Sequence, residues 1–311
     1  MALDSTPAGR GSRTDIYSRV SGFRSDMAFE WLTFRRYVAG ATGMAGLLIA
    51  LGIYTSASGS GLACAQQWPL CDGGVLPQSI PSFVEWFHRL WAMITGFVIF
   101  GGAIWAWRAD LPRVTTGAAV VAAVLTPMQA VFGAVTVTLE GAIPGGYSAP
   151  VHAAHFLTGT TIFLALTYAS LTSSERAVGT PTERVGTALR VAAVGAGVSL
   201  LVSRAIPVVG YGPWLQGGFY LAALTTLAAL VAAVRWVGAL GRPRLRAATA
   251  LATLAHLGAM VLGRDLVYYT ATVQNLNLAL ALTTAALVAG TLWSVETGRG
   301  RADRARAPTD D

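Results

Sequence analysis

The sequence predicts an all-α integral membrane protein with eight transmembrane helices. Of its 311 residues, 54% are hydrophobic and only 12% are charged, whereas about 25% of the residues of a soluble domain are charged. Its mean hydropathy is +0.55. Apolar stretches of about 20 residues, long enough to cross a bilayer core of about 30 Å, recur along the chain. They predict spans at 37–55, 85–107, 115–138, 151–172, 190–208, 216–236, 247–263 and 273–293.

The distribution of arginine predicts how these spans are oriented. The chain has no lysine, so all 22 basic residues are arginine. All but Arg89, Arg204 and Arg264 fall before the first span, after the eighth, or in alternate connections. Because basic loops stay in the cytoplasm, we expect both termini on the cytoplasmic side of a prokaryotic plasma membrane. Topology and anionic lipid then explain the net charge of +7, without nucleic acid as a partner.

Polar segments divide the chain into five parts. Residues 1–36 are rich in Arg, Ser and Gly and predict a disordered cytoplasmic tail, as do residues 297–311. Residues 173–189 predict a cytoplasmic linker between a first four-helix bundle, 37–172, and a second, 190–296. Two sets of four spans suggest that the two bundles are related by duplication.

Two histidines near the outer surface indicate a haem site. Ionisable side chains inside a membrane are costly, so each one is a candidate functional residue. His88 and His155 lie about one turn below the outer surface, near the starts of the second and fourth spans, and this is the geometry for axial ligation of one haem. His152 shares a face with His155 and either supports it or replaces it as a ligand. The alternative is that these are interfacial histidines satisfied by water or carbonyl groups.

Glu85 and Arg89 flank His88 on the second span. Glu85 lies one turn outward on the same face, where it could contact the porphyrin edge, handle protons or stabilise charge. It could equally be an exposed acid that the helix dipole favours. Arg89 could pair with a haem propionate or extend to the lipid headgroups.

Cys64 and Cys71 are the two cysteines of the chain and lie in the longest outer loop, about 56–84. An outer loop meets a redox environment that permits disulfides. Spacing alone leaves metal binding open, but the loop contains no histidine, which favours the disulfide. In the chain-entropy model, closing so short a loop is worth about 2–3 kcal/mol.

Four segments together resemble the haem A synthase family: GSGLACAQQWPLCDG at 59–73, EWFHR at 85–89, QAVFGAVTV at 129–137 and AAHF at 153–156. The resemblance covers the first half of the chain, about 37–172. It implies a pair of four-helix bundles that oxidises the C8 methyl of haem O to the formyl group of haem A, for a terminal oxidase.

The resemblance also implies roles for individual residues. His88 and His155 would ligate the substrate haem near the outer face, and Glu85 would be the acid essential for catalysis. Cys64 and Cys71 would form an outer pair that is redox-active or structural. The implied partners are haem O synthase, the assembly machinery of the terminal oxidase and an electron donor that the sequence does not identify.

The second half departs from the family pattern. The family has a histidine near the start of span six and another near the start of span eight, which hold a haem b cofactor. Here span six opens WLQGGFY at 214–220, and span eight has Asn277 at the matching position. His256 lies deeper, within span seven, and is interpreted as a buried structural histidine. A second haem b is therefore in doubt, and the second bundle is expected to be a scaffold.

Two other functions remain open. The chain could be a non-catalytic haem-binding or haem-delivery factor for oxidase assembly, or a b-type membrane electron-transfer protein. Glu85 and the cysteine loop favour the enzyme, because a simple electron carrier needs neither.

Overall fold

The computed structural model describes residues 32–64, 67–68, 70–138, 148–173, 179–206, 210–264 and 266–304. Most of the predicted tail 1–36 lies outside these residues. The described chain forms eight long α-helices and one short 3-10 helix, with no β-strand in the described part. Their bounds are α2 Phe34–Ala57, η1 Ser60–Leu62, α3 Ile80–Arg108, α4 Arg113–Thr138, α5 Ala149–Thr172, α6 Pro181–Leu201, α7 Pro213–Ala239, α8 Pro243–Leu262 and α9 Ala271–Arg304.

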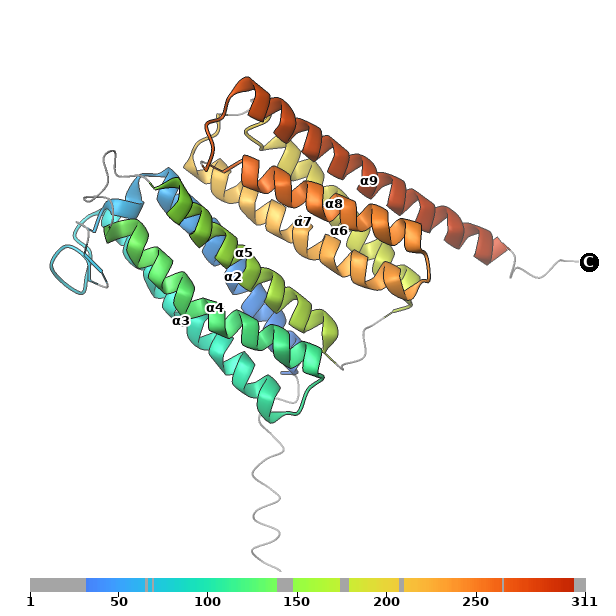
Figure 1. Cartoon of the computed structure of the whole chain (residues 1–311), viewed down its shortest axis with the longest axis horizontal. Coiled ribbons are helices and arrows are strands. Elements are labelled where there is room, and N and C mark those ends of the chain that lie inside the picture. The colour runs from blue at the N-terminus through green and yellow to red at the C-terminus, as the bar shows by residue number, and fades with distance from the viewer. Residues whose placement is uncertain are drawn as a thin grey trace, which may run out of the picture.

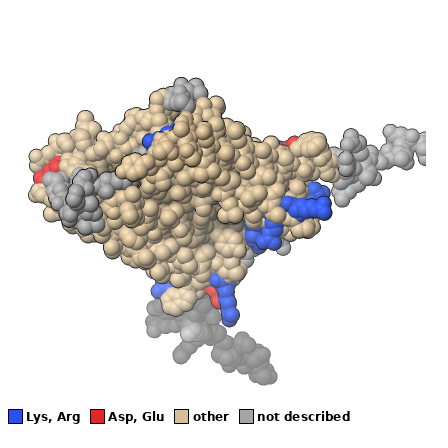
Figure 2. All heavy atoms as spheres, turned by 45° about the horizontal axis from the view of Figure 1, so that its top comes forward, with Lys and Arg blue, Asp and Glu red and all other residues tan. Residues whose placement is uncertain are grey.

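All eight long helices are apolar enough and long enough to cross a membrane. The predicted all-α integral membrane fold with eight spans is therefore confirmed. Most of the face shown in Figure 2 carries no charged side chain, and much of the visible arginine gathers toward one edge. A wide uncharged belt of this kind is what a lipid bilayer requires of the surface it surrounds.

The fifth span differs most from its predicted bounds, because α6 runs from Pro181 to Leu201 rather than over 190–208. The side chain of Thr180 accepts a hydrogen bond from Glu183 N (3.2 Å), and the Glu183 carboxylate accepts one from Thr180 N (2.9 Å). This capping box, with proline in the first turn, starts a helix efficiently. The start signals lie inside the predicted linker 173–189, so the linker is shorter than predicted.

The last helix also extends beyond its prediction. α9 continues to Arg304, whereas residues from 297 onward were expected to form a tail. Once formed, a helix adds residues at little cost, and no proline occurs between Ala271 and Pro308 to stop it.

The helices form two four-helix bundles that lie side by side (Figure 1). α2 to α5 form the first, and α6 to α9 form the second. In each bundle, consecutive helices contact each other and the first helix contacts the last. The two bundles thus share one order of helix contacts.

α2 and α7 form the main contact between the bundles, and α5 adds to it. One hydrophobic cluster crosses this boundary, with Phe163 of the first bundle and Leu224 of the second among its buried members. Small residues let the backbones approach, as at Gly217, where a Cβ would lie 3.4 Å from the Ala50 carbonyl oxygen. We call this α2–α7 contact the seam.

Three segments lie at the same end of the molecule: the connection between α2 and α3, the start of α5, and the connection between α8 and α9 (Figure 1). We call it the cysteine-loop end, because Cys64 and Cys71 lie there. The start of α2 and the end of α9 lie at the opposite end. The polar residues predicted to form a site are at or near the cysteine-loop end.

Candidate functional site

The first turn of α3 folds together with the cysteine loop. Ser79 caps the helix, its side chain accepting a hydrogen bond from Ser82 N. The hydroxyl of Ser82 lies 3.1 Å from both the Ala63 carbonyl oxygen and Asp72 Oδ1. The start of the helix is thus tied to both sides of the loop.

Cys64 and Cys71 lie within this unit. The structure brings their sulfur atoms into bonding contact, and both side chains are fully buried. Each sulfur lies within 3.8 Å of the Ser82 carbonyl oxygen. The pair therefore packs directly on the first turn of α3.

Glu85 and Arg89 attach the cysteine loop to α3 through hydrogen bonds. Glu85 is only 2% exposed, so its interpretation as an exposed helix acid is wrong. Its carboxylate accepts a hydrogen bond from Cys64 N (3.0 Å) and forms an ion pair with Arg89. Arg89 Nη1 also donates to the carbonyl oxygens of Gln67 (2.8 Å) and Leu70 (3.0 Å). Both charged side chains thus form hydrogen bonds to the backbone of the cysteine loop.

His88 lies one turn further along α3 than Glu85, and His155 lies near the start of α5. Each residue is partly buried, and in each the Nδ1 atom is buried without a hydrogen-bond partner. Since buried polar atoms are normally hydrogen-bonded, these two exceptions, on α3 and α5 of one bundle, make His88 and His155 candidates for binding a ligand.

Glycines on the neighbouring helices make room for the two imidazole rings. A Cβ at Gly52 of α2 would lie 2.9 Å from His88 Cε1, and a Cβ at Gly133 of α4 would lie 3.3 Å from His155 Cε1. Any larger residue would push the rings from their places. Sequence reasoning did not identify these glycines, because only the packing of four helices places them opposite the histidines.

His152 and Gln129 surround His155. The Nδ1–H of His152 donates to the Ser148 carbonyl oxygen at 3.0 Å, and His155 makes a hydrogen bond to the backbone of Gln129. Gln129 Oε1 is buried without a partner. Gln129 was not singled out from the sequence, although an amide in an apolar span was the available signal.

In the second bundle, the two residues considered as ligands already have hydrogen-bond partners within the protein. His256 is buried, and its Nε2–H donates to the Ala223 carbonyl oxygen at 2.8 Å. Asn277 is buried, and its amide donates to the Tyr269 hydroxyl at 3.1 Å. Both residues line a cavity of about 20 Å³, enough for about one water molecule. These residues do not fit a haem held by two histidines.

Tyr269 lies outside the spanning helices, in the connection before α9. Burial raises the pKa of its hydroxyl, so the group remains neutral and can accept the hydrogen bond from Asn277. The guanidinium of Arg204 lies over the Tyr269 ring, 4.2 Å from the ring centroid. A cation over an aromatic face is a favourable contact. One of the three arginines expected on the outer side thus has a partner within the protein.

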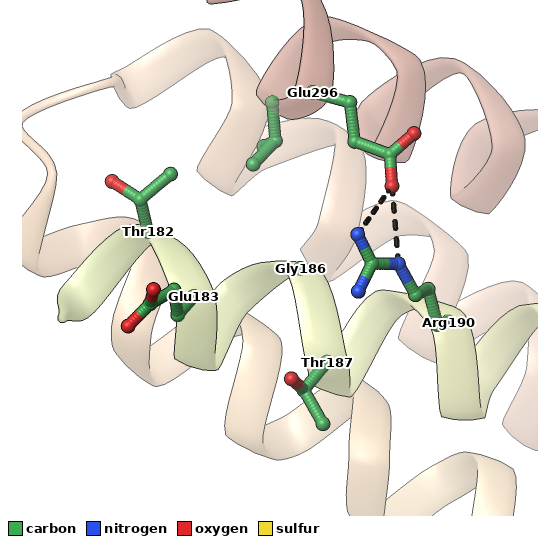
Figure 3. A pocket seen from close by; sticks show the side chains of 7 residues that line it. Thr182, Glu183, Gly186, Thr187, Arg190 and Glu296 are labelled. Atoms are coloured by element: carbon green, nitrogen blue, oxygen red, sulfur yellow. Dashed lines mark hydrogen bonds and ion pairs between the residues drawn. The ribbon is translucent and has the colours of Figure 1, made fainter. Parts of the chain in front are cut away.

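A second cavity, of about 70 Å³, lies near the other end of the second bundle between α6 and α9 (Figure 3). Arg190 reaches across it to Glu296, donating from Nε (3.1 Å) and Nη2 (2.8 Å) to one carboxylate oxygen. Both side chains are substantially exposed, at 59% and 45%. The two charges neutralise each other, so both charged side chains that bridge this cavity are already paired.

The described residues contain no group of three or more His, Cys, Asp or Glu side chains that could hold a bare metal ion. Two imidazoles suffice for a haem, because the porphyrin supplies the other ligands of the iron. The buried Nδ1 atoms of His88 and His155, which have no partner within the protein, fit such a ligand. Fold and site thus define an all-α integral membrane protein with a two-histidine candidate haem site.

A family model described as cytochrome oxidase assembly protein (COX15-CtaA) matches residues 35–207. This is more than half of the chain, and the chain belongs to this family. The match contains the whole first bundle and α6, and it ends before α7. It therefore covers both histidines of the candidate site but not His256 or Asn277.

Three curated relatives show the same pattern of partial similarity. A Protoheme IX farnesyltransferase of Halobacterium salinarum is 39% identical over 132 residues, 42% of this chain and 27% of the relative. A Heme A synthase of Bacillus licheniformis is 35% identical over 107 residues, 34% of this chain and 33% of the relative. A Heme A synthase of Shouchella clausii is 36% identical over 129 residues, 40% of this chain and 39% of the relative. The matched part thus spans less than two fifths of each relative.

Proposed function

We propose that this protein is a haem A synthase, which oxidises the C8 methyl of haem O to the formyl group of haem A. The observation that carries the proposal is the pair His88 and His155, with buried, unpartnered nitrogen atoms beside the buried carboxylate of Glu85. Similarity to proteins named Heme A synthase, at 35% and 36% identity, supports it.

The proposed reaction is a four-electron oxidation. The methyl group and one water, written as the formal source of oxygen, give the formyl group, four protons and four electrons. Dioxygen or a membrane redox carrier accepts the electrons. The iron of the bound haem supplies redox chemistry that side chains lack, and the protein positions the macrocycle and controls access to it.

His88 and His155 hold the substrate from two helices, which fixes its position relative to Glu85. Glu85 is the essential carboxyl group of the reaction, because its carboxylate would accept a proton or offset positive charge that develops during the oxidation. Arg89 keeps the carboxylate in place and fastens the cysteine loop over the start of α3. The loop limits the access of water to this end of the site.

We also propose the setting in which the enzyme works. Arginine distribution supports cytoplasmic termini and a site near the outer face, and the prokaryotic origin of the relatives supports a prokaryotic plasma membrane. There Cys64 and Cys71 form a disulfide, with a structural role because it packs on the helix that carries His88. Haem O synthase would supply the substrate, and the assembly machinery of a terminal oxidase would receive the product.

The second bundle is proposed to be the scaffold of a one-haem enzyme. Its contacts follow the same order as those of the first bundle, which supports duplication, but His256 and Asn277 are engaged within the protein. Electrons would therefore reach the site from a partner rather than through a second haem.

Haem extraction tests the proposal. The chain is expressed in a host that produces haem O but no haem A, beside an empty vector, and the membrane haems are separated by chromatography. We expect haem A or its alcohol intermediate only in cells with the protein. Unmodified haem alone, with a reductant supplied, would contradict the enzyme.

Glu85→Gln separates chemistry from binding. Gln retains an oxygen that can accept the hydrogen bond from Cys64 N but carries no charge, so we expect bound haem to remain and formyl production to fall about 100-fold or more, as for the loss of an acid–base group. The matched control is Glu296→Gln at the opposite end, with unchanged production. Equal production by Glu85→Gln and the wild type would remove the carboxylate from the mechanism.

A haem-binding or haem-delivery factor is the second candidate. The small cavity of the second bundle and its engaged polar residues favour it, because they leave one haem site where the family resemblance implies two. In the extraction experiment, this candidate predicts bound haem B or haem O that is never modified.

A further inference from the structure

Arg264 is a buried arginine that follows α8, two residues after the helix ends at Leu262. It is only 6% exposed, and its Nε and Nη1 atoms are buried without a hydrogen-bond partner. None of the ion pairs found among the described residues includes it. A buried charge without a partner is costly. A guanidinium held in this way therefore points to an anion that binds beside it.

Contacts between the bundles place Arg264 near the histidine site. The ring of Phe156, next to His155 in α5, packs edge-on against Tyr220 of α7 at 5.5 Å between centroids. The Tyr220 hydroxyl donates to the Met260 carbonyl oxygen at 2.7 Å, one turn of α8 before Arg264. The charge of Arg264 acts on both His152 and His155. An anion bound by Arg264 would thus lie close to whatever His155 holds.

The other arginines expected on the outer side already have partners. Arg89 binds Glu85 and the carbonyl oxygens of Gln67 and Leu70. Arg204 lies over the ring of Tyr269. Arg264 is thus the outer arginine for which the described residues supply no anion and no hydrogen-bond acceptor to Nε and Nη1.

We propose that Arg264 binds a carboxylate of the ligand that His88 and His155 hold, so that the second bundle completes the site of the first. This inference rests on the proposed function, because it takes the ligand to be an iron tetrapyrrole with acidic side chains. A guanidinium matches a carboxylate with two parallel hydrogen bonds. The second bundle thereby contributes directly to binding while holding no haem of its own.

The test compares a haem with its neutral ester. Full-length wild type, Arg264→Met and Arg264→Lys are purified in an uncharged detergent without phosphate or anionic lipid, and each is titrated with haem B and with haem B dimethyl ester. Low-spin absorption reports binding. We expect the wild type to bind the free acid at least tenfold more tightly than the ester, Arg264→Met to lose this preference, and Arg264→Lys to keep part of it.

Two controls make the result specific. Arg190→Met, at the opposite end, should bind both ligands like the wild type. The ligand-free Arg264→Met protein should unfold at a higher temperature than the wild type, because a buried unpaired charge has been removed. If Arg264→Met does not purify, Arg264→Gln takes its place in the same comparison.

The outcomes separate this inference from the proposed function. An unchanged preference for the acid in Arg264→Met overturns the inference, and so does equal weakening for acid and ester, which would mark a structural role. Either result leaves the histidine site standing if the wild type shows low-spin haem that His88→Ala removes. Absence of low-spin haem in the wild type would refute both.

Discussion

Polar side chains within the two bundles differ in what they contact. In the first bundle, His88 and His155 each leave a buried nitrogen without a partner. In the second, His256 is bonded to a backbone carbonyl and Asn277 to Tyr269. Two bundles with the same order of helix contacts thus differ at the positions considered as iron ligands. The first keeps buried imidazole nitrogens without a partner, typical of a binding site, whereas in the second His256 and Asn277 are bonded within the protein, and the buried atoms without a partner belong to residues such as Ser199, Ser203 and Arg264.

The largest expected effect is at the first-bundle histidines. His88→Ala removes one of the two proposed axial ligands, so low-spin haem absorption should disappear from the purified protein. His256→Gln is the matched control, because an amide can still donate to the Ala223 carbonyl oxygen, and its spectrum should equal that of the wild type. A normal spectrum in His88→Ala would end the ligand assignment.

A smaller effect is expected where a glycine faces His88. In Gly52→Ala, the new Cβ would lie 2.9 Å from His88 Cε1, so the ring must move. We expect about tenfold weaker haem binding, about 1.4 kcal/mol, measured by titration. Gly43→Ala on the same helix is the control, because nothing lies within 4 Å of its Cβ. Equal affinities in the two variants would show that the ring has space to adjust.

The two ion pairs extend the comparison to stability. Arg190→Ala breaks an exposed pair, so the free energy of unfolding should fall by at most about 1 kcal/mol. Arg89→Ala should cost more, because it leaves the buried Glu85 carboxylate without its cation. Thermal unfolding in detergent measures both. A larger loss of unfolding free energy in Arg190→Ala than in Arg89→Ala would contradict this prediction.

The smallest effect is expected from restoring a histidine in the second bundle. Asn277→His introduces the residue type that the family pattern has there, yet the surrounding cavity is about 20 Å³, far too small for a macrocycle. The haem content per chain should therefore equal that of the wild type, as measured by iron and pyridine haemochrome assays. Additional haem in this variant would mean that the second bundle opens readily.

Hydropathy and isolated polar residues made much of this molecule predictable. The eight spans follow from composition, and His88, His155 and Glu85 stand out because polar groups are rare in spans. The early start of α6 was missed, because Thr180 and Pro181 begin the helix in a polar segment. Hydropathy identifies only apolar stretches. Gly52 and Arg264 were missed for another reason. Gly52 lies on α2 and Arg264 follows α8, whereas the histidines lie on α3 and α5, and only tertiary packing shows what each residue faces.

The seam has an evolutionary consequence. Gly217 lies against the Ala50 carbonyl oxygen, and Trp214 packs on Tyr54 at 4.4 Å between ring centroids. If the halves descend from one ancestral gene, fusion freed the second copy from selection for iron ligands, while selection on its α7 surface continued. Loss of histidines from the second copy would then carry no penalty, whereas a larger residue at Gly217 would press on the backbone of α2. Divergence among descendants should therefore concentrate inside the second bundle and spare its contact with α2.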